Sequence, residues 1–355
     1  MQYATSSDGV RIAYLTIGDG PPLVFASNIF GEATGYCGGS PFGRVPDRLA
    51  RLGRRVILYD QRGMGASDRN VEDFTLEGRV RDLCAVVGAL GLDRFALAGV
   101  DIGAATAVAY AVEHQTSVSH LVLLSPWSSG ARYLEIPALR AAYSVEASGE
   151  HERKLFANIL GSVASGFADP DFVRVGTELF LRNVSSAVLS AFNAATARID
   201  IANLLPRVTI PTLVTHEPAF PFGSFHLCQE VAAGIPHAEF VVVAGNSIAG
   251  RDHDDNVATI DRFLRAGTAT RRTGSSLEQV SINTPPTANG LTPREVQVLS
   301  HVAAGDSNKE IAGQLGVAVS TVERHLVNLY TKIGARGRAD AIAFALRRGL
   351  ARPSR

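Results

Sequence analysis

Short apolar runs alternate with longer amphipathic segments over the first 265 residues. Six runs are rich in β-branched or aromatic side chains, and they occupy residues 22–27, 55–60, 95–99, 120–125, 212–215 and 239–245. Continuous apolar strands separated by helical patterns are typical of a mostly parallel sheet with helices on both faces. The pattern therefore predicts an α/β fold for this part of the chain.

One interval breaks the alternation, because residues 130–208 contain helical patterns and no convincing strand. We expect this interval to form a helical cap inserted into the α/β fold. Further along, residues 267–289 are dominated by Thr, Ser, Gly, Pro and Asn and have little apolar periodicity, which indicates a linker. The expected organisation is a first domain over 1–266, then the linker, then a second domain over 290–355.

Three helix starts are marked in the second domain by a Ser or Thr that is followed three residues later by Glu. The pairs are Thr292 with Glu295, Ser307 with Glu310, and Ser320 with Glu323. In such a capping box, the two side chains satisfy backbone amides that otherwise lack partners at the start of a helix. The pattern predicts three consecutive helices.

Apolar residues recur at helical spacing after each start: Val296, Leu299, Val302, Ile311, Leu315, Val322, Leu326, Leu329 and Ile333. The second and third helices are separated by a short turn that contains Gly316, which suits the left-handed end of a helix. A short helix, a tight turn and a longer helix make a small all-α helix-turn-helix domain. Polar side chains on the third helix and at the start of the second are then candidates for contacts with bases and phosphates. They are Asn308, Lys309, Thr321, Glu323, Arg324, Asn328 and Lys332.

Charge is distributed unevenly, although the chain as a whole is neutral. Residues 1–264 carry 21 Lys and Arg against 28 Asp and Glu, whereas residues 291–355 carry 10 against 5. A basic second domain suits a polyanionic partner such as DNA. This charge favours phosphate contacts over simple solvation for Arg324 and Lys332, and it leaves the role of His325 undecided.

The segment Leu291–Leu350 resembles the LuxR-type (GerE-like) DNA-binding domain over its whole length. The resemblance implies double-stranded DNA as a partner, a fourth helix from about Arg338 to Leu346, and a homodimer formed through that helix. The family's third helix usually begins Thr-Val-Lys, whereas this chain has Thr321, Val322 and Glu323. Two roles are open for Glu323, which either caps the helix or accepts a hydrogen bond from a cytosine amino group.

Two motifs in the first domain follow predicted strands. Asp60-Gln-Arg-Gly-Met-Gly-Ala-Ser-Asp68 follows the strand at 55–60, and Gly99-Val-Asp-Ile-Gly103 joins the strand at 95–99 to a helix. With the cap and the strand order, these motifs resemble the α/β-hydrolase family over about residues 1–265. The second matches the family's Gly-x-nucleophile-x-Gly turn, in which small residues let the helix pack close to the sheet. The resemblance places Asp101 at the nucleophile position.

An aspartate in this position resembles the nucleophile of haloalkane dehalogenases and epoxide hydrolases, in which a carboxylate attacks carbon to form an ester. Such chemistry needs a histidine base and an orienting acid. The expected base position holds Asn246 and Ser247, and the next histidine, His253, is either a displaced base or a solvated loop residue. Glu217 is either a substitute acid or the start of a loop. A hydrolase that lacks both partners is not expected to turn over substrate.

Trp127 is the single tryptophan of the chain, and it is not next to Asp101 in the sequence as the halide clamp of a dehalogenase would be. Asp101 is therefore a nucleophile, a polar anchor for a bound ligand, or a structural carboxylate. We favour the anchor, because family members enclose a largely apolar cavity under the cap. The positions expected to line a ligand site are Asn28, Ile29, Phe30, Asp101, Ile102, Trp127, Tyr133 and Tyr143.

Three scattered cysteines, Cys37, Cys84 and Cys228, do not form a disulfide framework or a zinc site. The first residues lack the pattern of a signal peptide, and the apolar stretch Phe95–Val112 contains Asp101 at its centre. We therefore expect a cytoplasmic protein without a membrane segment, metal or cofactor. The predicted function is a homodimeric, ligand-responsive transcriptional regulator whose hydrolase-like domain binds a small molecule without turnover. The alternative is an active α/β-hydrolase with Asp101 as nucleophile that carries a DNA-binding domain.

Overall fold

The computed structural model describes residues 1–26, 32–37, 44–143, 150–165, 169–243, 254–269, 293–304, 306–315, 319–333, 335 and 337–347. The chain divides into two compact units, residues 1–273 and 274–355. The last helix of the first unit, α11 (Asp254–Ala269), continues three residues beyond the expected domain limit at 266.

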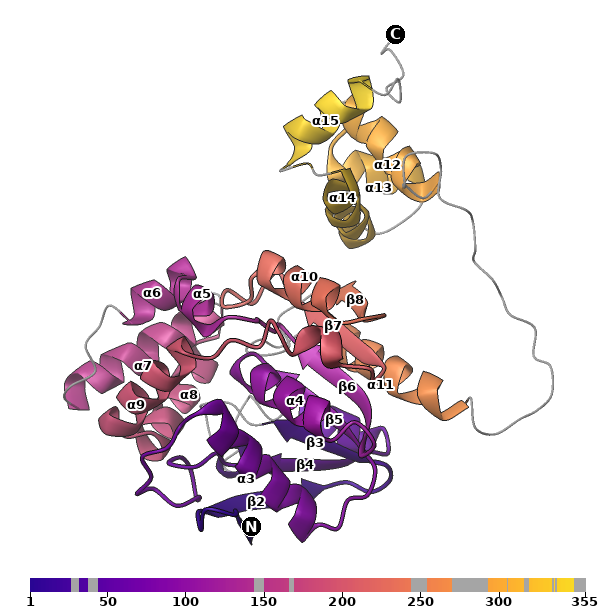
Figure 1. Ribbon diagram of the computed structural model, residues 1–355. Coiled ribbons are helices and arrows are strands. Elements are labelled where there is room, and N and C mark those ends of the chain that lie inside the picture. Colours follow the sequence, from indigo (N-terminus) through magenta and orange to yellow (C-terminus); the bar gives the residue numbers. More distant parts are fainter. Residues whose placement is uncertain are drawn as a thin grey trace. The chain divides into compact units, whose positions relative to one another are not determined.

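The first unit is built on an eight-stranded sheet with the order β1-β2-β4-β3-β5-β6-β7-β8 (Figure 1). The strands are β1 (Gln2–Thr5), β2 (Arg11–Ile17), β3 (Pro22–Ala26), β4 (Arg55–Tyr59), β5 (Phe95–Val100), β6 (Val118–Leu124), β7 (Thr212–His216) and β8 (Glu239–Val242). All six predicted strands are present and parallel to their neighbours within that set. The sequence analysis missed β1 and β2, which add an antiparallel pair at one edge.

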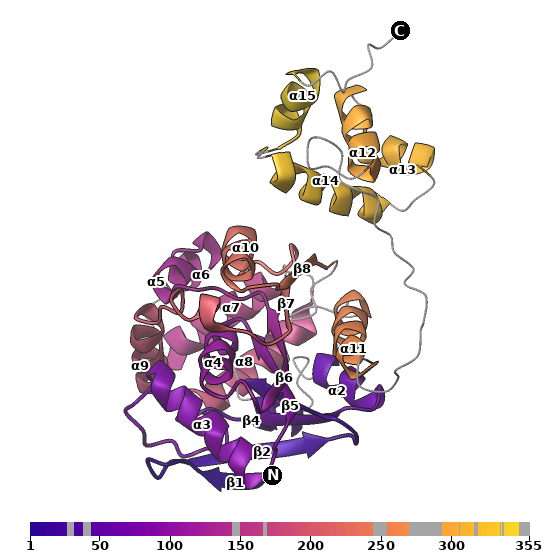
Figure 2. The same ribbon diagram turned by 45° about the vertical axis from the view of Figure 1, so that its right-hand side comes forward.

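Helices cover both faces of this sheet (Figure 2). One face carries α3 (Leu76–Ala89), α4 (Ile102–Glu113) and α10 (Phe225–Gly234), and the other carries α1 (Glu32–Cys37), α2 (Arg44–Arg51) and α11. Each face buries its own apolar core, and the core beneath α3 and α4 extends into the cap. Burial on both faces explains why the central strands lack a polar alternation.

The cap lies between β6 and β7. Its helices are α5 (Gly130–Leu134), α6 (Pro137–Tyr143), α7 (Glu150–Ala164), α8 (Pro170–Asn183) and α9 (Ser186–Ala197), followed by the short 3-10 helix η2 (Leu205–Arg207). Arg79 of α3 joins the cap to the core, because its Nη2 donates to Thr196 Oγ1 at 2.9 Å and its guanidinium lies 4.0 Å from the ring centroid of Phe192. The predicted helical insertion is thus present, and it is fastened to the sheet domain by a buried arginine.

The loop that follows β4 is organised around two buried charged residues. Asp60 accepts hydrogen bonds from the backbone N–H groups of Ala33 and Ala66, both at 2.9 Å. Arg62 donates from Nη2 to Asp82 at 2.8 Å and from Nη1 to Asp8 at 2.9 Å. The Asp60–Asp68 motif therefore has a structural role in which it connects the N-terminal hairpin, the loop and α3.

The second unit contains the helices α12 (Pro293–Ala304), α13 (Asn308–Leu315), α14 (Val319–Ile333) and α15 (Arg338–Arg347). Its core includes six of the predicted apolar residues, and these are Leu299, Val302, Ile311, Val322, Leu326 and Leu329. Leu315 and Ile333 are half-buried against this core, and the side chain of Val296 lies outside the described residues. The helix-turn-helix prediction is confirmed, as is the fourth helix.

The helix starts agree with the capping boxes at two of three places. Pro293 begins α12 directly after Thr292, and Thr292 itself lies outside the described residues. Gly316, the residue expected in the turn before the third helix, also lies outside them. At α13, the Ser307 N–H donates to Glu310 Oε2 at 2.7 Å and the Glu310 N–H donates to Ser307 Oγ at 3.4 Å. The third prediction is wrong, because α14 begins at Val319 and Ser320 lies within its first turn instead of before it. No helix in the described ranges has the length and apolar character needed to cross a membrane.

Candidate functional site

Asp101 lies in a strained turn between β5 and α4. Its backbone has φ 50° and ψ −113°, a conformation that costs a residue with a side chain on the order of 1–3 kcal/mol. The turn is held because the Asp101 N–H donates to the Leu124 carbonyl at 2.8 Å. A Cβ atom on Gly99 would lie only 2.6 Å from Cα of Ala104, so a glycine is needed for the helix to approach the strand. Strain of this kind is typical of functional turns.

Aromatic residues surround the carboxylate of Asp101. The Tyr133 hydroxyl, from the first cap helix, donates to Asp101 Oδ2 at 2.8 Å. The ring of Tyr133 is stacked on Trp127, with centroids 5.0 Å apart, and Trp127 is 1% exposed. Although Trp127 is remote from Asp101 in the sequence, the fold brings it beside the carboxylate, which corrects the expectation drawn from sequence distance.

Burial controls the ionisation of Asp101. Desolvation raises the pKa of its carboxyl group to about 7, although the Tyr133 hydroxyl, the Trp127 indole N–H and the Ile102 backbone N–H each favour the ionised form. The nearby Asp101 charge in turn contributes to raising the pKa of Tyr143, whose main cause is its own burial. Asp101 is thus a carboxyl group that changes its protonation state near neutral pH.

Several buried polar atoms at this edge of the sheet have no hydrogen-bond partner within the described residues. They are Asp101 Oδ1, Trp127 Nε1, Ser125 Oγ and Thr215 Oγ1. The indole N–H of Trp127 therefore acts on the carboxylate without the short, aligned geometry of a hydrogen bond. Strands β5, β6 and β7 are neighbours, so residues at or just beyond their carboxyl ends lie along one edge. Unsatisfied buried groups are rare in proteins, and each one calls for an explanation such as a water molecule, a ligand or a catalytic role.

A second buried cluster follows β7. Glu217 is fully buried and accepts a hydrogen bond from Asn256 Nδ2 of α11 at 2.7 Å. His216 contacts the Cys228 thiol at 3.7 Å, and burial lowers the pKa of its imidazole to about 4, so it is neutral at pH 7. Glu217 therefore starts the loop after β7, as one of the two interpretations expected, and its side chain is buried and hydrogen-bonded.

The predicted site residues separate into those that the structure describes and those that it does not. Ile102 is buried, and Tyr143 is half-buried with its ring 5.2 Å from that of Phe156, centroid to centroid. Asn28, Ile29, Phe30 and His253 lie outside the described residues, as do Asn246 and Ser247. Sequence reasoning missed Ser125 and Thr215, and the available signal was their position at the carboxyl ends of two predicted strands.

Within the described ranges, no group of three or more His, Cys, Asp and Glu residues is arranged to hold a metal ion.

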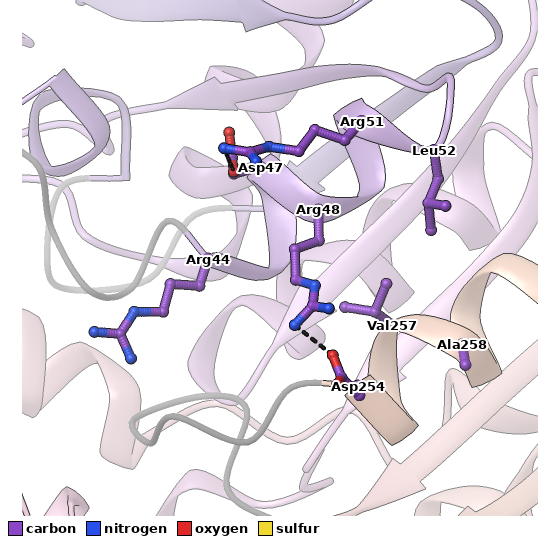
Figure 3. Close-up of a pocket in the computed structure, with 8 residues that line it drawn as sticks. All are labelled: Arg44, Asp47, Arg48, Arg51, Leu52, Asp254, Val257 and Ala258. Carbon is purple, nitrogen blue, oxygen red and sulfur yellow. Dashed lines mark ion pairs between the residues drawn. The ribbon is translucent and has the colours of Figure 1, made fainter.

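A groove of about 890 Å³ lies elsewhere on the first unit, between α2 and α11 (Figure 3). Arginines on α2 line it, but carboxylates neutralise two of them. Arg48 forms an ion pair with Asp254, and Arg51 pairs with Asp47 at 2.9 Å. The groove does not contain Asp101 or any of its partners.

The candidate DNA-contacting residues of the second unit occupy α13 and α14. Glu323, Arg324 and Asn328 are exposed on α14, and Thr321 and His325 are half-buried. On α13, Lys309 is exposed, and Asn308 accepts a hydrogen bond from Arg338 at 3.5 Å. The structure brings these residues to one helix-turn-helix, and their contacts with DNA remain a prediction.

Lys332 has a partner inside the domain. Its Nζ lies 2.9 Å from Oε2 of Glu295, a carboxylate that is almost fully buried, while the lysine side chain is 39% exposed. The lysine therefore compensates a buried charge, a role that the sequence interpretation did not foresee.

Replacing Lys332 by alanine is expected to destabilise the second unit by about 1–3 kcal/mol, because Glu295 loses its charged hydrogen-bond donor. Hydrogen exchange of the full chain, followed by mass spectrometry, should show faster exchange in α12 and α14. Combining Lys332→Ala with Glu295→Gln should restore part of the protection. If exchange in the Lys332→Ala variant equals that of the wild type, the pair contributes nothing to stability.

Comparisons with known proteins agree with this division. The model of the "Bacterial regulatory proteins, luxR family" matches residues 289–345, and the model of the "alpha/beta hydrolase fold" matches residues 21–168. The AB hydrolase superfamily protein YisY of Bacillus subtilis is 25% identical over 255 residues, which span 69% of this chain and 91% of that protein.

Solved structures resemble the first unit. A thermophilic esterase from Thermogutta terrifontis superposes with a TM-score of 0.61 at 21% identity, over 75% of this chain and 98% of the esterase. A structure from a study of carboxylesterases of Nitrososphaera gargenis superposes with a TM-score of 0.63 at 19% identity, over 76% of this chain and all of the other. At these identities the similarity shows the fold.

Proposed function

Because the chain joins an α/β-hydrolase-fold domain to a LuxR-family DNA-binding domain, we propose that it is a transcriptional regulator controlled by a small molecule that binds at Asp101. The hydrolase-fold domain serves as the sensor, and the ligand is bound without turnover. The observation that carries the proposal is the set of buried, unpartnered polar atoms around Asp101, in a chain whose second unit is a helix-turn-helix.

The geometry around Asp101 favours binding over hydrolysis. Tyr133 occupies one carboxylate oxygen, and no histidine in the described ranges forms a hydrogen bond or ion pair with Asp101. A nucleophilic carboxylate needs a base that activates water for the second step. A carboxyl group with one bonded and one unpartnered oxygen is well suited to orient a ligand.

We further propose that the protein acts in the cytoplasm as a homodimer, with one α14 helix for each DNA half-site. Ligand binding would favour one geometry of the dimer over another, because a ligand shifts a conformational equilibrium only through its different affinity for the two states. Sedimentation equilibrium at micromolar concentration tests the dimer. The homodimer proposal is contradicted if the protein is monomeric both when free and when bound to DNA.

DNA binding by the full chain is expected to weaken roughly a hundredfold between 50 and 200 mM salt, which is the effect of neutralising about four phosphates. Fluorescence anisotropy with a DNA fragment from a randomised-site selection measures this. Arg324→Ala and Lys309→Ala should each reduce the salt slope by about 1 if the side chain contacts a phosphate. The matched control is Arg140→Ala on the exposed surface of the first unit, which should leave the slope unchanged. An affinity that is independent of salt contradicts the DNA-binding assignment.

Regulation is tested by isolating the ligand with the protein. Small molecules released from the purified full chain are identified by mass spectrometry and then added back to stripped protein. We expect the added ligand to change the affinity of the protein for its operator, and Asp101→Asn to reduce that change. Steady turnover of an ester, epoxide or haloalkane by the wild type, lost in Asp101→Asn, would instead identify the alternative function, an active hydrolase with a DNA-binding domain.

A further inference from the structure

The chemistry of the unpartnered atoms beside Asp101 restricts the ligand that they accept. Trp127 Nε1 can only donate a hydrogen bond, whereas Oδ1 of ionised Asp101 can only accept one. Both atoms are buried and without a partner among the described residues, and the indole N–H is close enough to act on the carboxyl group. A single group that satisfies both atoms must donate one hydrogen bond and accept another.

A hydroxyl group meets this requirement with a single oxygen, because it donates one hydrogen bond and accepts others. An organic cation would satisfy the carboxylate but would face the indole N–H with a like partial charge. An anion would accept from the indole but would lie against the carboxylate. The unpartnered atoms Trp127 Nε1 and Asp101 Oδ1 therefore favour a neutral ligand group that both donates and accepts over a charged ligand group.

Apart from the Ser125 and Thr215 hydroxyl groups at the same edge of the sheet, the residues around the pair are apolar or aromatic. Ile102 is buried next to Asp101, and the rings of Tyr133 and Trp127 are stacked. In the cap, the ring of Tyr143 of α6 packs on Phe156. A ligand body that replaces water against such residues gains about 25 cal/mol for each Å² of apolar surface that it buries.

We propose that the sensor ligand is a neutral alcohol with an apolar body, whose hydroxyl group donates to Asp101 Oδ1 and accepts from the Trp127 indole N–H. This inference rests on the proposed function, since it names the ligand class of the same site. Because the ligand donates to the ionised carboxylate, binding favours that form and releases a proton in the pH range where Asp101 would otherwise be protonated.

The single tryptophan makes the inference directly measurable. In the full-length wild-type protein labelled with 15N, only Trp127 gives an indole N–H cross-peak. The probes are pairs of neutral compounds that differ only in the hydroxyl group: cyclohexanol with methylcyclohexane, and benzyl alcohol with toluene. We expect the alcohols at millimolar concentration to move the cross-peak toward higher proton frequency, and the hydrocarbons to leave it nearly unchanged.

Variants then separate hydrogen bonding from packing. Trp127→Phe keeps an aromatic ring against Tyr133 but removes the N–H, and it should weaken alcohol binding by roughly tenfold to a hundredfold in calorimetric titration. Hydrocarbon binding should change far less. Tyr133→Phe is the matched control, because it removes the hydroxyl that bonds the other carboxylate oxygen and should affect the alcohol less than Trp127→Phe does.

Each outcome decides one of the two proposals. No cross-peak shift with any alcohol, an equal shift with the hydrocarbons, or equal losses for both members of a pair in Trp127→Phe would overturn the alcohol inference. If the alcohols bind as expected but no ligand changes DNA affinity, the regulatory proposal fails and the ligand class stands. If an isolated ligand changes DNA affinity while the indole cross-peak stays in place, the regulatory proposal stands and the alcohol inference fails.

Discussion

Replacing Arg62 by methionine is expected to lower the free energy of unfolding of the first unit by about 3–5 kcal/mol. The guanidinium is 1% exposed, and it donates from Nε and Nη2 to Asp82, whose side chain is fully buried. Removing the cation leaves a buried carboxylate without its counter-charge, which is costlier than the loss of the pair itself. Urea unfolding followed by Trp127 fluorescence measures the change, because this tryptophan lies in the first unit.

Two further variants test the cause of that loss. The double variant Arg62→Met with Asp82→Leu removes both charges and should recover much of the stability, since apolar residues often replace a buried ion pair at little cost. Arg174→Ala is the control, because Arg174 and its partner Glu178 are 62% and 68% exposed and the pair should contribute about 0.2–1 kcal/mol. A loss in Arg62→Met no greater than that in Arg174→Ala would show that the buried network does not hold the fold together.

The fold could be predicted where the signal is local. The six parallel strands are continuous apolar runs, and the capping box of Ser307 and Glu310 joins residues three positions apart. The strand β1 was missed because only Ala4 of its four residues is buried. The strand β2 was missed although residues 12–15 form a buried apolar run. Periodicity detects an element when the element itself carries the pattern of burial.

The site could be predicted only in part, because its partners come from distant segments. The glycines around Asp101 indicated the turn from the sequence. The hydrogen bond from Tyr133 to Asp101 depends on the position of the first cap helix in the folded domain. Likewise, exposure on a helix suggested a DNA contact for Lys332, and its ion pair with Glu295, 37 positions earlier, follows from packing between helices. Such tertiary contacts leave no periodic trace in the sequence.

Asp101→Asn is expected to make the first unit more stable at neutral and alkaline pH. The folded pKa of Asp101 is raised from 3.8 to about 7, so the folded chain binds this proton more tightly than the unfolded chain. For an acid with a raised pKa, the stabilising contribution is complete below about pH 4 and is lost as the pH rises to about 7. Asparagine keeps an acceptor for Tyr133 and cannot ionise, so it avoids that loss.

The expected gain is up to about 4 kcal/mol above pH 7, and it should shrink to nearly zero below pH 4. Urea unfolding of both proteins across this range, again followed by Trp127 fluorescence, gives the difference in stability. The pH dependence of this difference in the free energy of unfolding comes from Asp101, since other groups such as His216 titrate alike in both proteins. A constant difference across the pH range would show that folding does not change the pKa of Asp101.

A residue that lowers stability at working pH is retained when function requires it. The same variant therefore connects stability with function: if Asp101 anchors a ligand, the stabilised Asp101→Asn protein should bind DNA as the wild type does without ligand and should respond less when ligand is added. If Asp101 is a nucleophile, the variant loses turnover that the wild type shows, because an amide cannot form the ester. A variant that is unchanged in stability, ligand response and turnover would leave Asp101 with neither role, and would refute the sensor site proposed at the end of β5.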